Sequence, residues 1–392
     1  MNVPKLRFKE FKNDWSPKNL SEVVAFSKGN SLSKSDLDEQ GSYPCILYGE
    51  LYTKYHEVIR KVFSKTNYIS DNIVKSKYGD ILIPASGETP IDISTSSCIL
   101  LDNVLLGGDI NILSPKNCDG RFISYMISNN KRKTIARVAQ GHSIVHLYSE
   151  NLKKVNLDIP LLSEQKKIAD MLELLDKKIE LQTKKIEALK LFKKGLLKRI
   201  FSSVSNYKAF KNVATLKNGY AFKNNLYSKA GKYNIVTISN VTGNKYIDTN
   251  FKNKYEILPT DLQPHQLLKN NDILISMTGN VGRVSLNRGC NNLLNQRVGL
   301  IVPNADINSF YLFYALSNTH FEHSMINLAQ GAAQANISKE DIDNYMVPVL
   351  PKDKQIQIAN ILNIYFNLLF LETEKLRKLE TLKKGLMQSM FI

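Results

Sequence analysis

The chain has 392 residues, of which 43% are hydrophobic, enough for two domains of ordinary size and too many residues for a single one. Its 53 Lys and Arg residues outnumber its 36 Asp and Glu residues, and the formal charge of +17 favours a polyanionic partner such as DNA, RNA or an anionic membrane. The four cysteines form no Cys-x-x-Cys pair. They argue against a zinc site and a disulfide framework, so we expect them to be small buried hydrophobic residues.

The predicted elements begin with an N-terminal arm, residues 1–15, which lacks the apolar core of a signal peptide. The longest apolar stretch of the chain, residues 365–371, is broken by Asn367 and is far shorter than a membrane span. We therefore expect a soluble, cytoplasmic protein with no membrane partner.

Residues 16–158 form the first predicted globular domain. Short apolar runs bounded by turn residues, such as residues 79–83, are typical of β-strands. Because strands and helices do not alternate in a regular βαβ rhythm, we predict a mixed α/β (α+β) fold.

A long amphipathic helix follows within residues 159–203. Its apolar residues recur at alternating spacings of three and four, with polar interruptions at Gln182 and Lys193, which is the pattern of a coiled-coil seam. Ser163 is the predicted N-cap, and about 35 residues of helix would be roughly 50 Å long. The predicted seam residues of this helix are Ile168, Leu172, Leu175, Ile179, Ile186, Leu189 and Leu196.

The rest of the chain repeats this plan at an offset near 190 residues, which makes it an internal repeat. Between residues 165 and 201, 13 of 37 positions are identical to those 190 residues later, where chance would give roughly two or three. The globular parts match more weakly: Pro115 and Phe122 correspond to Pro303 and Phe310 at an offset of 188.

The second copy therefore has a globular domain at residues 204–350 and a long helix within residues 351–392. Asp353 is its predicted N-cap. Its seam is interrupted at Glu372 and Lys383, the positions equivalent to Gln182 and Lys193. The predicted seam residues of the second helix are Ile358, Leu362, Leu369, Leu376, Leu379 and Leu386.

Two matched seams in one chain predict that the helices pair with each other as a coiled coil. A single apolar stripe on a helix of this length needs a partner, and the other copy offers one of the same length and spacing. The alternative is that each stripe packs only on its own globular domain.

The sequence offers no catalytic or metal centre. It contains no phosphate-binding loop, no Gly-x-Gly-x-x-Gly and no Asn/Asp-Pro-Pro-aromatic motif. Glu10 and Glu164 each begin a nuclease-like Glu-x-Lys string, but neither has the required Pro-Asp partner on a preceding strand. The pairs His142 with His146 and His320 with His323 lack a third ligand, so we expect ordinary histidines.

Together these features resemble the specificity subunits of type I restriction–modification systems. Residues 4–11, followed by Trp15, resemble the characteristic start of that family, and residues 160–169 resemble the block that opens its central conserved helix. In the second copy of this block, Lys354 stands where glutamate is usual, although Gln355, Ile358 and Ala359 are retained. The resemblance covers essentially the whole chain.

The resemblance implies a non-catalytic subunit in which each globular domain recognises one half of a split site on double-stranded DNA. The two helices would be an antiparallel spacer, and a pseudo-twofold axis through them would suit two half-sites on a duplex. Two methyltransferase subunits are the expected protein partners, with two restriction subunits as an optional addition. No cofactor is expected in this chain, since S-adenosylmethionine belongs to the methyltransferase and ATP and Mg²⁺ to the restriction subunit.

Candidate base-reading residues lie on loops at matched places of the two halves, because sequence reading needs polar side chains that reach base edges. Arg283 and Arg297 are candidates for bidentate recognition of guanine. The candidates in the first half are Lys28, Ser31, Ser86, Glu88, Thr89, Gln140 and His142. Those in the second half are Lys217, Tyr220, Lys223, Thr278, Asn280, Arg283, Gln296, Arg297 and Gln334.

Two other hypotheses stay open at this point. The chain could be a coiled-coil adaptor that binds proteins without recognising DNA, although its charge speaks against this. It could also hold a cryptic nuclease site, which would require Glu164 to act in cleavage.

Overall fold

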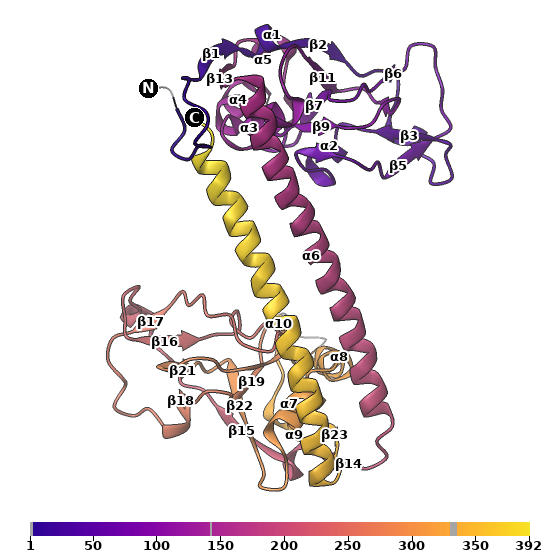
Figure 1. Cartoon of the computed structure of the whole chain (residues 1–392). Helices are drawn as coiled ribbons and strands as arrows, with labels where there is room; N and C mark the ends of the chain where they lie inside the picture. Colours follow the sequence, from indigo (N-terminus) through magenta and orange to yellow (C-terminus); the bar gives the residue numbers. More distant parts are fainter. Residues whose placement is uncertain (1–2, 142, 330–334) are drawn as a thin grey trace. The chain divides into compact units, whose positions relative to one another are not determined.

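The computed structural model describes residues 3–141, 143–329 and 335–392 (Figure 1). The chain divides into two compact units. Unit 1 comprises Met1–Leu181 and Arg377–Ile392, and unit 2 comprises Gln182–Leu376. The mixed α/β class and the duplicated plan predicted from the sequence are confirmed.

Unit 1 contains a five-stranded sheet in the order β2-β11-β7-β9-β4. Its central strand β7 is buried along its whole length, as expected of the continuous apolar run Ile-Leu-Ile. The strands of this sheet are β2 (Val24–Lys28), β4 (Val58–Ile59), β7 (Ile81–Pro84), β9 (Ser97–Ile99) and β11 (Ile110–Pro115).

A second, four-stranded sheet of unit 1 has the order β5-β3-β10-β6, and two further strand pairs complete the unit. In one pair the first and last strands of the globular part, β1 and β13, run antiparallel from Ser16 opposite Ile159. The remaining strands are β1 (Ser16–Asn19), β3 (Tyr43–Ile46), β5 (Ser64–Thr66), β6 (Val74–Lys75), β8 (Ser86–Gly87), β10 (Leu105–Leu106), β12 (Val145–His146) and β13 (Asn156–Ile159). The short helices are α1 (Leu20–Val23), η1 (Lys34–Asp36), α2 (Glu50–Thr53), α3 (Gly120–Asn129), α4 (Arg132–Val138) and α5 (Ser149–Lys153).

Unit 2 repeats this arrangement, with sheets in the orders β15-β22-β19-β20 and β17-β16-β21-β18 and the closing pair β14-β23. Its strands are β14 (Tyr207–Ala209), β15 (Ala214–Asn218), β16 (Tyr233–Val236), β17 (Lys254–Tyr255), β18 (Leu267–Leu268), β19 (Ile273–Ser276), β20 (Val284–Leu286), β21 (Asn292–Leu294), β22 (Val298–Pro303) and β23 (Met346–Pro348). Its short helices are η2 (Phe210–Asn212), η3 (Asn224–Leu226), η4 (Pro264–Gln266), α7 (Ser309–Leu316), α8 (Thr319–Leu328) and α9 (Lys339–Asp343).

The two units share strand register as well as strand order. In unit 1, β2 pairs with β11 so that Val24 lies opposite Pro115. In unit 2, β15 pairs with β22 so that Ala214 lies opposite Pro303. The weak sequence matches at offsets of 190 and 188 therefore correspond to the same places in two copies of one fold.

The long helices are α6 (Leu162–Ser202), with 41 residues, and α10 (Lys352–Ser389), with 38. Each is one uninterrupted helix, drawn in magenta and yellow in Figure 1. Both are longer than predicted, and the predicted N-caps Ser163 and Asp353 are wrong because each lies inside the first turn. The backbone N–H groups of Gln165 and Gln355 donate to the carbonyls of Leu161 and Pro351, so each helix starts earlier than its polar residue suggests.

Within unit 1, the first half of α6 packs against the end of α10. Ile168 and Leu172 share a buried core cluster with Met387 and Phe391. The ammonium group of Lys383 lies 2.8 Å from a carboxylate oxygen of Asp176. The predicted pairing of the helices is thus confirmed in this unit.

Within unit 2, the second half of α6 packs against the first half of α10. The Gln182 amide donates to Glu372 Oε2 over 2.7 Å, so the two predicted interruptions of the seams meet each other. The Tyr365 hydroxyl donates to the Leu189 carbonyl. As the residue number rises along α6 it falls along α10, so the helices are antiparallel, and each contributes to the cores of both units.

The predicted seam residues differ in exposure. Ile168, Leu172, Leu175, Ile186 and Leu362 are buried. The others are half-buried: Ile179, Leu189, Leu196, Ile358, Leu369, Leu376, Leu379 and Leu386. Most seam residues are therefore partly exposed to solvent, as expected where only two helices pack together.

The cysteine prediction is correct for part of the set. Cys45 and Cys98 are buried and Cys118 is half-buried, but Cys290 is exposed. Cys290 lies in the turn between β20 and β21. All four are free thiols. In the part of the chain that the structure describes, no helix is apolar over the length needed to cross a membrane.

Candidate nucleic-acid interface

In each unit, the loop after the central strand pairs with a segment near the end of the globular part. We call this pairing the clip. In unit 1 the short strand β8 (Ser86–Gly87) pairs with β12 (Val145–His146). In unit 2 the equivalent contact is an isolated bridge between Thr278 and Asn336, whose side chains also share a 2.9 Å hydrogen bond. The clip therefore holds the loop after β7 or β19 at the same place in both units.

A second loop in each unit joins the two sheets, and we call these the crossing loops, residues 107–109 and 295–297. In unit 1 the loop joins β10 to β11, and in unit 2 it joins β21 to β22. The chain that leaves β2 or β15 passes so closely over this loop that only glycine fits. A Cβ on Gly29 would lie 2.0 Å from the Gly107 carbonyl oxygen, and one on Gly219 would lie 2.1 Å from that of Asn295.

The backbone of each crossing loop is held from both sides. In unit 2, Asn295 N–H donates to Val236 O and Gln296 N–H to Tyr220 O, while Arg297 O accepts from Met277 N–H. In unit 1, residues 107, 108 and 109 make the corresponding bonds to Ile46 O, Leu32 O and Ala85 N–H. The backbone framework is thus the same in both units.

The predicted DNA-binding residues of unit 1 lie near these loops but differ in access. Lys28, at the end of β2, is exposed, as are Glu88, Thr89 and Gln140. Ser31 is half-buried and has a positive φ of 63°. Ser86 is buried, and its hydroxyl donates to Asp109 Oδ2 over 2.9 Å, so it supports another side chain. His142 lies outside the described residues.

Those of unit 2 also fall into accessible and occupied groups. Lys217, Lys223, Asn280, Gln296 and Arg297 are exposed. Tyr220 is half-buried and its hydroxyl donates to Asp261 Oδ1, while Thr278 is buried in the clip. Arg283 forms a 3.2 Å ion pair with Glu322, so its guanidinium already has a carboxylate. Gln334 lies outside the described residues.

A hollow in unit 2 opens beside the crossing loop. Its walls include the rings of Phe222 and Tyr227, the amides of Asn224, Asn253 and Gln296, and the guanidinium of Arg297. Aromatic rings stack on the faces of nucleobases, and amides and a guanidinium form hydrogen bonds with their polar edges. Of these residues the sequence predicted only Gln296 and Arg297, because the others come together only through folding.

Positive charge is concentrated in unit 2. Residues 182–254 contain 16 Lys and Arg but only two acidic residues, Glu187 and Asp248. Such a segment favours phosphate contacts and counterion release, which provide affinity without sequence information.

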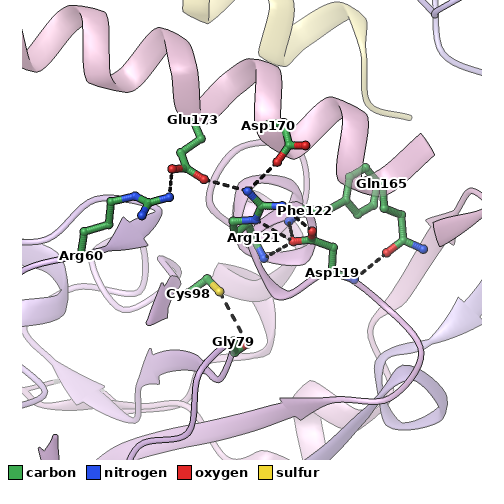
Figure 2. A network of polar contacts seen from close by, with 9 residues as sticks. All are labelled: Arg60, Gly79, Cys98, Asp119, Arg121, Phe122, Gln165, Asp170 and Glu173. Atoms are coloured by element: carbon green, nitrogen blue, oxygen red, sulfur yellow. Dashed lines mark hydrogen bonds and ion pairs between the residues drawn. The ribbon is translucent and has the colours of Figure 1, made fainter. Parts of the chain in front are cut away.

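In unit 1 a network of ion pairs connects the globular part to α6 (Figure 2). Arg121 lies between Asp119, Asp170 and Glu173, with 2.7–2.8 Å contacts to all three carboxylates. Glu173 also accepts from Arg60, which approaches from another part of the unit. Burial opposes the charge of Arg121, yet Asp119 and Asp170 raise the pKa of its guanidinium above the usual value. Sequence patterns gave no signal for this network because its members are far apart in the chain.

The equivalent junction of unit 2 has amides where unit 1 has carboxylates. Asn308 caps α7 where Asp119 caps α3, and its backbone N–H donates to the Gln355 amide oxygen as Asp119 N–H donates to Gln165. At the offset of 190, Asn363 replaces Glu173. Its amide oxygen accepts from Lys245, and burial lowers the pKa of that lysine to about 8.

A matched pair of lysines on the helices differs in the same way. Lys383 of unit 1 contacts Glu57 at 3.0 Å and Asp176 at 2.8 Å. Burial alone would lower the pKa of Lys383, but the two carboxylates raise it. Lys193 of unit 2 instead lies 4.4 Å from the centre of the Phe366 ring, and burial lowers its pKa to about 8.

The glutamate and histidines considered for catalysis or metal binding have structural partners. Glu164 is fully buried, and both of its carboxylate oxygens accept from Arg7, at 2.7 and 2.8 Å. His320 lies 3.1 Å from the Tyr345 hydroxyl, and His146 stacks on Tyr148. Over residues 3–141, 143–329 and 335–392, no cluster of three potential metal ligands occurs.

Comparison with known proteins identifies the fold and the repeat. The model of the type I restriction modification DNA specificity domain matches twice, at residues 12–191 and 205–381. The MjaVIII specificity subunit of a type I restriction enzyme from Methanocaldococcus jannaschii is 23% identical, over 95% of this chain and 91% of that one. A type I restriction–modification S subunit from M. genitalium has a TM-score of 0.71 at 16% identity, over 100% of this chain and 99% of that one. A chain solved in work on complex assembly and conformational transition of the type I R-M system has a TM-score of 0.51 at 14% identity, with 95% and 96% covered.

Proposed function

The chain belongs to the type I restriction modification DNA specificity family, and we propose that it directs a modification complex to a DNA target split into two parts. It is the subunit that supplies DNA sequence specificity and is not itself an enzyme. The observation that carries the two-part target is the duplication of one loop framework with different side chains in the two units.

Each globular domain would recognise one half of the target. We keep the division into an arm (1–15), two target-recognition domains (16–158 and 204–350) and two spacer segments (159–203 and 351–392) as part of the proposal. Exposed lysines such as Lys28 and Lys217 would bind phosphates, while polar loop residues would contact base edges. The paired helices, with the seams predicted above, would set the separation of the half-sites.

The complex would contain two methyltransferase subunits, each carrying S-adenosylmethionine, and two restriction subunits with ATP and Mg²⁺ where the host has them. Exposed apolar residues of the long helices, including Leu181, Phe192 and Ile364, offer contact area for protein partners.

The competing hypotheses have less support. Nothing in the comparisons favours a coiled-coil adaptor without DNA recognition. A cryptic nuclease would need Glu164 free for catalysis, but Arg7 binds both of its carboxylate oxygens.

The test is the methylated sequence in cells that express the chain with its methyltransferase. We expect one motif with two defined parts and a fixed gap. Exchanging residues 16–158 for the corresponding domain of a relative should change only one part. An exchange that changed both parts, or a methylated motif without a gap, would contradict the proposal.

A control distinguishes recognition from general affinity. The same exchange at residues 204–350 should change the other part alone. Titration of the complex against duplexes that carry the motif or a scrambled sequence, at two salt concentrations, separates base recognition from phosphate binding.

A further inference from the structure

The two crossing loops have the same backbone framework but opposite charges at one matched position. Asp109 and Arg297 are related by the same offset, 188, that relates Pro115 to Pro303. The backbone carbonyl of each residue accepts a hydrogen bond from the N–H of the residue that follows β7 or β19. This residue is Ala85 for Asp109 and Met277 for Arg297. Position 109 in unit 1 and position 297 in unit 2 are therefore the same place in the fold.

Arg297 is well placed to contact a base. Its side chain is exposed, and its guanidinium forms no hydrogen bond or ion pair within the part of the chain that the structure describes. Its backbone N–H donates to the Asn295 side chain, and Asn295 itself is buried. A rigid loop that carries a free guanidinium loses little conformational freedom on binding, and a guanidinium can contact guanine O6 and N7 together.

Asp109 presents the opposite chemistry from the same place. It is exposed, has a positive φ of 57°, and accepts a hydrogen bond from the buried Ser86 hydroxyl. The remaining lone pairs of this carboxylate can accept from the amino group of a base, of which cytosine N4 in the major groove is the usual partner of an acidic side chain. Its neighbours Gly107 and Gly108 add no competing side chain.

We propose that positions 109 and 297 are a matched pair of specificity determinants, with Arg297 reading a guanine in one half-site and Asp109 a cytosine amino group in the other. This inference rests on the proposed function. A constant backbone with a variable side chain would let one fold read different bases in its two copies. An aspartate at this place also repels phosphates, so the position contributes recognition and not general affinity.

The experiment compares methylated motifs of variants of the full chain, each expressed with its methyltransferase. Arg297→Ala should relax one base position in one part of the motif, with discrimination against the wrong base falling about 5- to 150-fold. Arg297→Lys should relax the same position, because lysine keeps the charge but loses the bidentate fork. Asp109→Asn should alter one position in the other part only.

Two exposed residues serve as matched controls. Arg288 lies over the rings of Tyr246 and Phe370 and outside the crossing loop, and Asp71 lies on the loop before β6. Arg288→Ala and Asp71→Asn should leave the motif unchanged.

The outcomes separate this inference from the proposed function. If Arg297→Ala weakens methylation uniformly at an unchanged motif, or if Arg297→Lys behaves as the wild type, Arg297 contacts a phosphate and the inference is wrong. The same holds if Asp109→Asn leaves every base preference intact. A wild-type chain with an unsplit motif would instead overturn the proposed function itself.

Discussion

Replacing the equivalent lysines Lys193 and Lys383 by methionine should change the stability of the two units in opposite directions. Methionine has nearly the length of lysine and removes its charge. For Lys193, the fall of the pKa from 10.5 to about 8 corresponds to roughly 3–4 kcal/mol of unfavourable burial, at ~1.4 kcal/mol for each pKa unit. Loss of the cation–π contact with the Phe366 ring offsets about 1 kcal/mol of the stability gained by removing the buried charge. Lys193→Met should therefore stabilise unit 2 by about 2–3 kcal/mol at pH 7.

Lys383→Met removes the cation that neutralises Glu57 and Asp176, both mostly buried. Leaving such carboxylates unpaired typically costs about 3 kcal/mol or more, so unit 1 should be destabilised. The difference between the two variants follows from the exchange of Asp176 for Phe366 at the matched position.

The effect of Lys193 should also depend on pH. The folded state releases this proton near pH 8 and the unfolded state near 10.5, so between these values the unfolded state binds more protons and wild-type stability rises with pH. The advantage of Lys193→Met should be full below pH 8 and should shrink as the pH rises toward 10.5.

Urea denaturation of the full chain can follow the two units separately. Trp15 is the single tryptophan and is buried in the core of unit 1, so its fluorescence reports that unit. Hydrogen exchange in α7, which is buried in unit 2, reports the other after correction for the intrinsic effect of pH. The reasoning is refuted if both variants shift stability in the same direction at pH 7, or if the Lys193→Met advantage is as large at pH 10 as at pH 7.

Three further substitutions test contacts within each unit. Arg121→Met should lower the stability of unit 1 by about 3–5 kcal/mol, because three carboxylates lose their shared cation; unchanged Trp15 fluorescence midpoints would contradict this. Glu164→Gln should destabilise unit 1 through loss of the Arg7 ion pair, by about 2 kcal/mol in urea titrations, while methylation specificity in the folded complex stays the same. Gln182→Leu should cost about 1–3 kcal/mol in unit 2, measured by hydrogen exchange along α10, because Glu372 loses a buried donor; a gain in stability would show that this polar pair is dispensable.

The sequence predicts the long helices and their pairing because both depend on periodicity, which a sequence displays directly. The seam spacing and the matched interruptions Gln182 and Glu372 indicate which helix faces meet, and the structure joins these two residues by a hydrogen bond. The start of each helix was misplaced because Ser163 and Asp353 are typical caps, while backbone bonds to Leu161 and Pro351 decide the first turn.

The interface could be predicted only in part, because access depends on tertiary contacts. Ser86 has the right chemistry and lies in the right loop, yet pairing of β8 with β12 buries it. Asp109 was missed because an isolated acidic residue in a basic chain carries no local signal. Its offset of 188 to Arg297 was the available clue, and the shared backbone bonds of the crossing loops give that offset its meaning.

The antiparallel pairing of the first and last strands of each globular part has a consequence for how such proteins diversify. Ser16 lies opposite Ile159 and Tyr207 lies opposite Pro348, so the chain enters and leaves each domain through a two-strand neck. A domain inserted at such a strand pair is joined to the same two flanking segments, whatever its own sequence. Recombination at these strands would therefore exchange a whole globular domain in one event, with the long helices left intact.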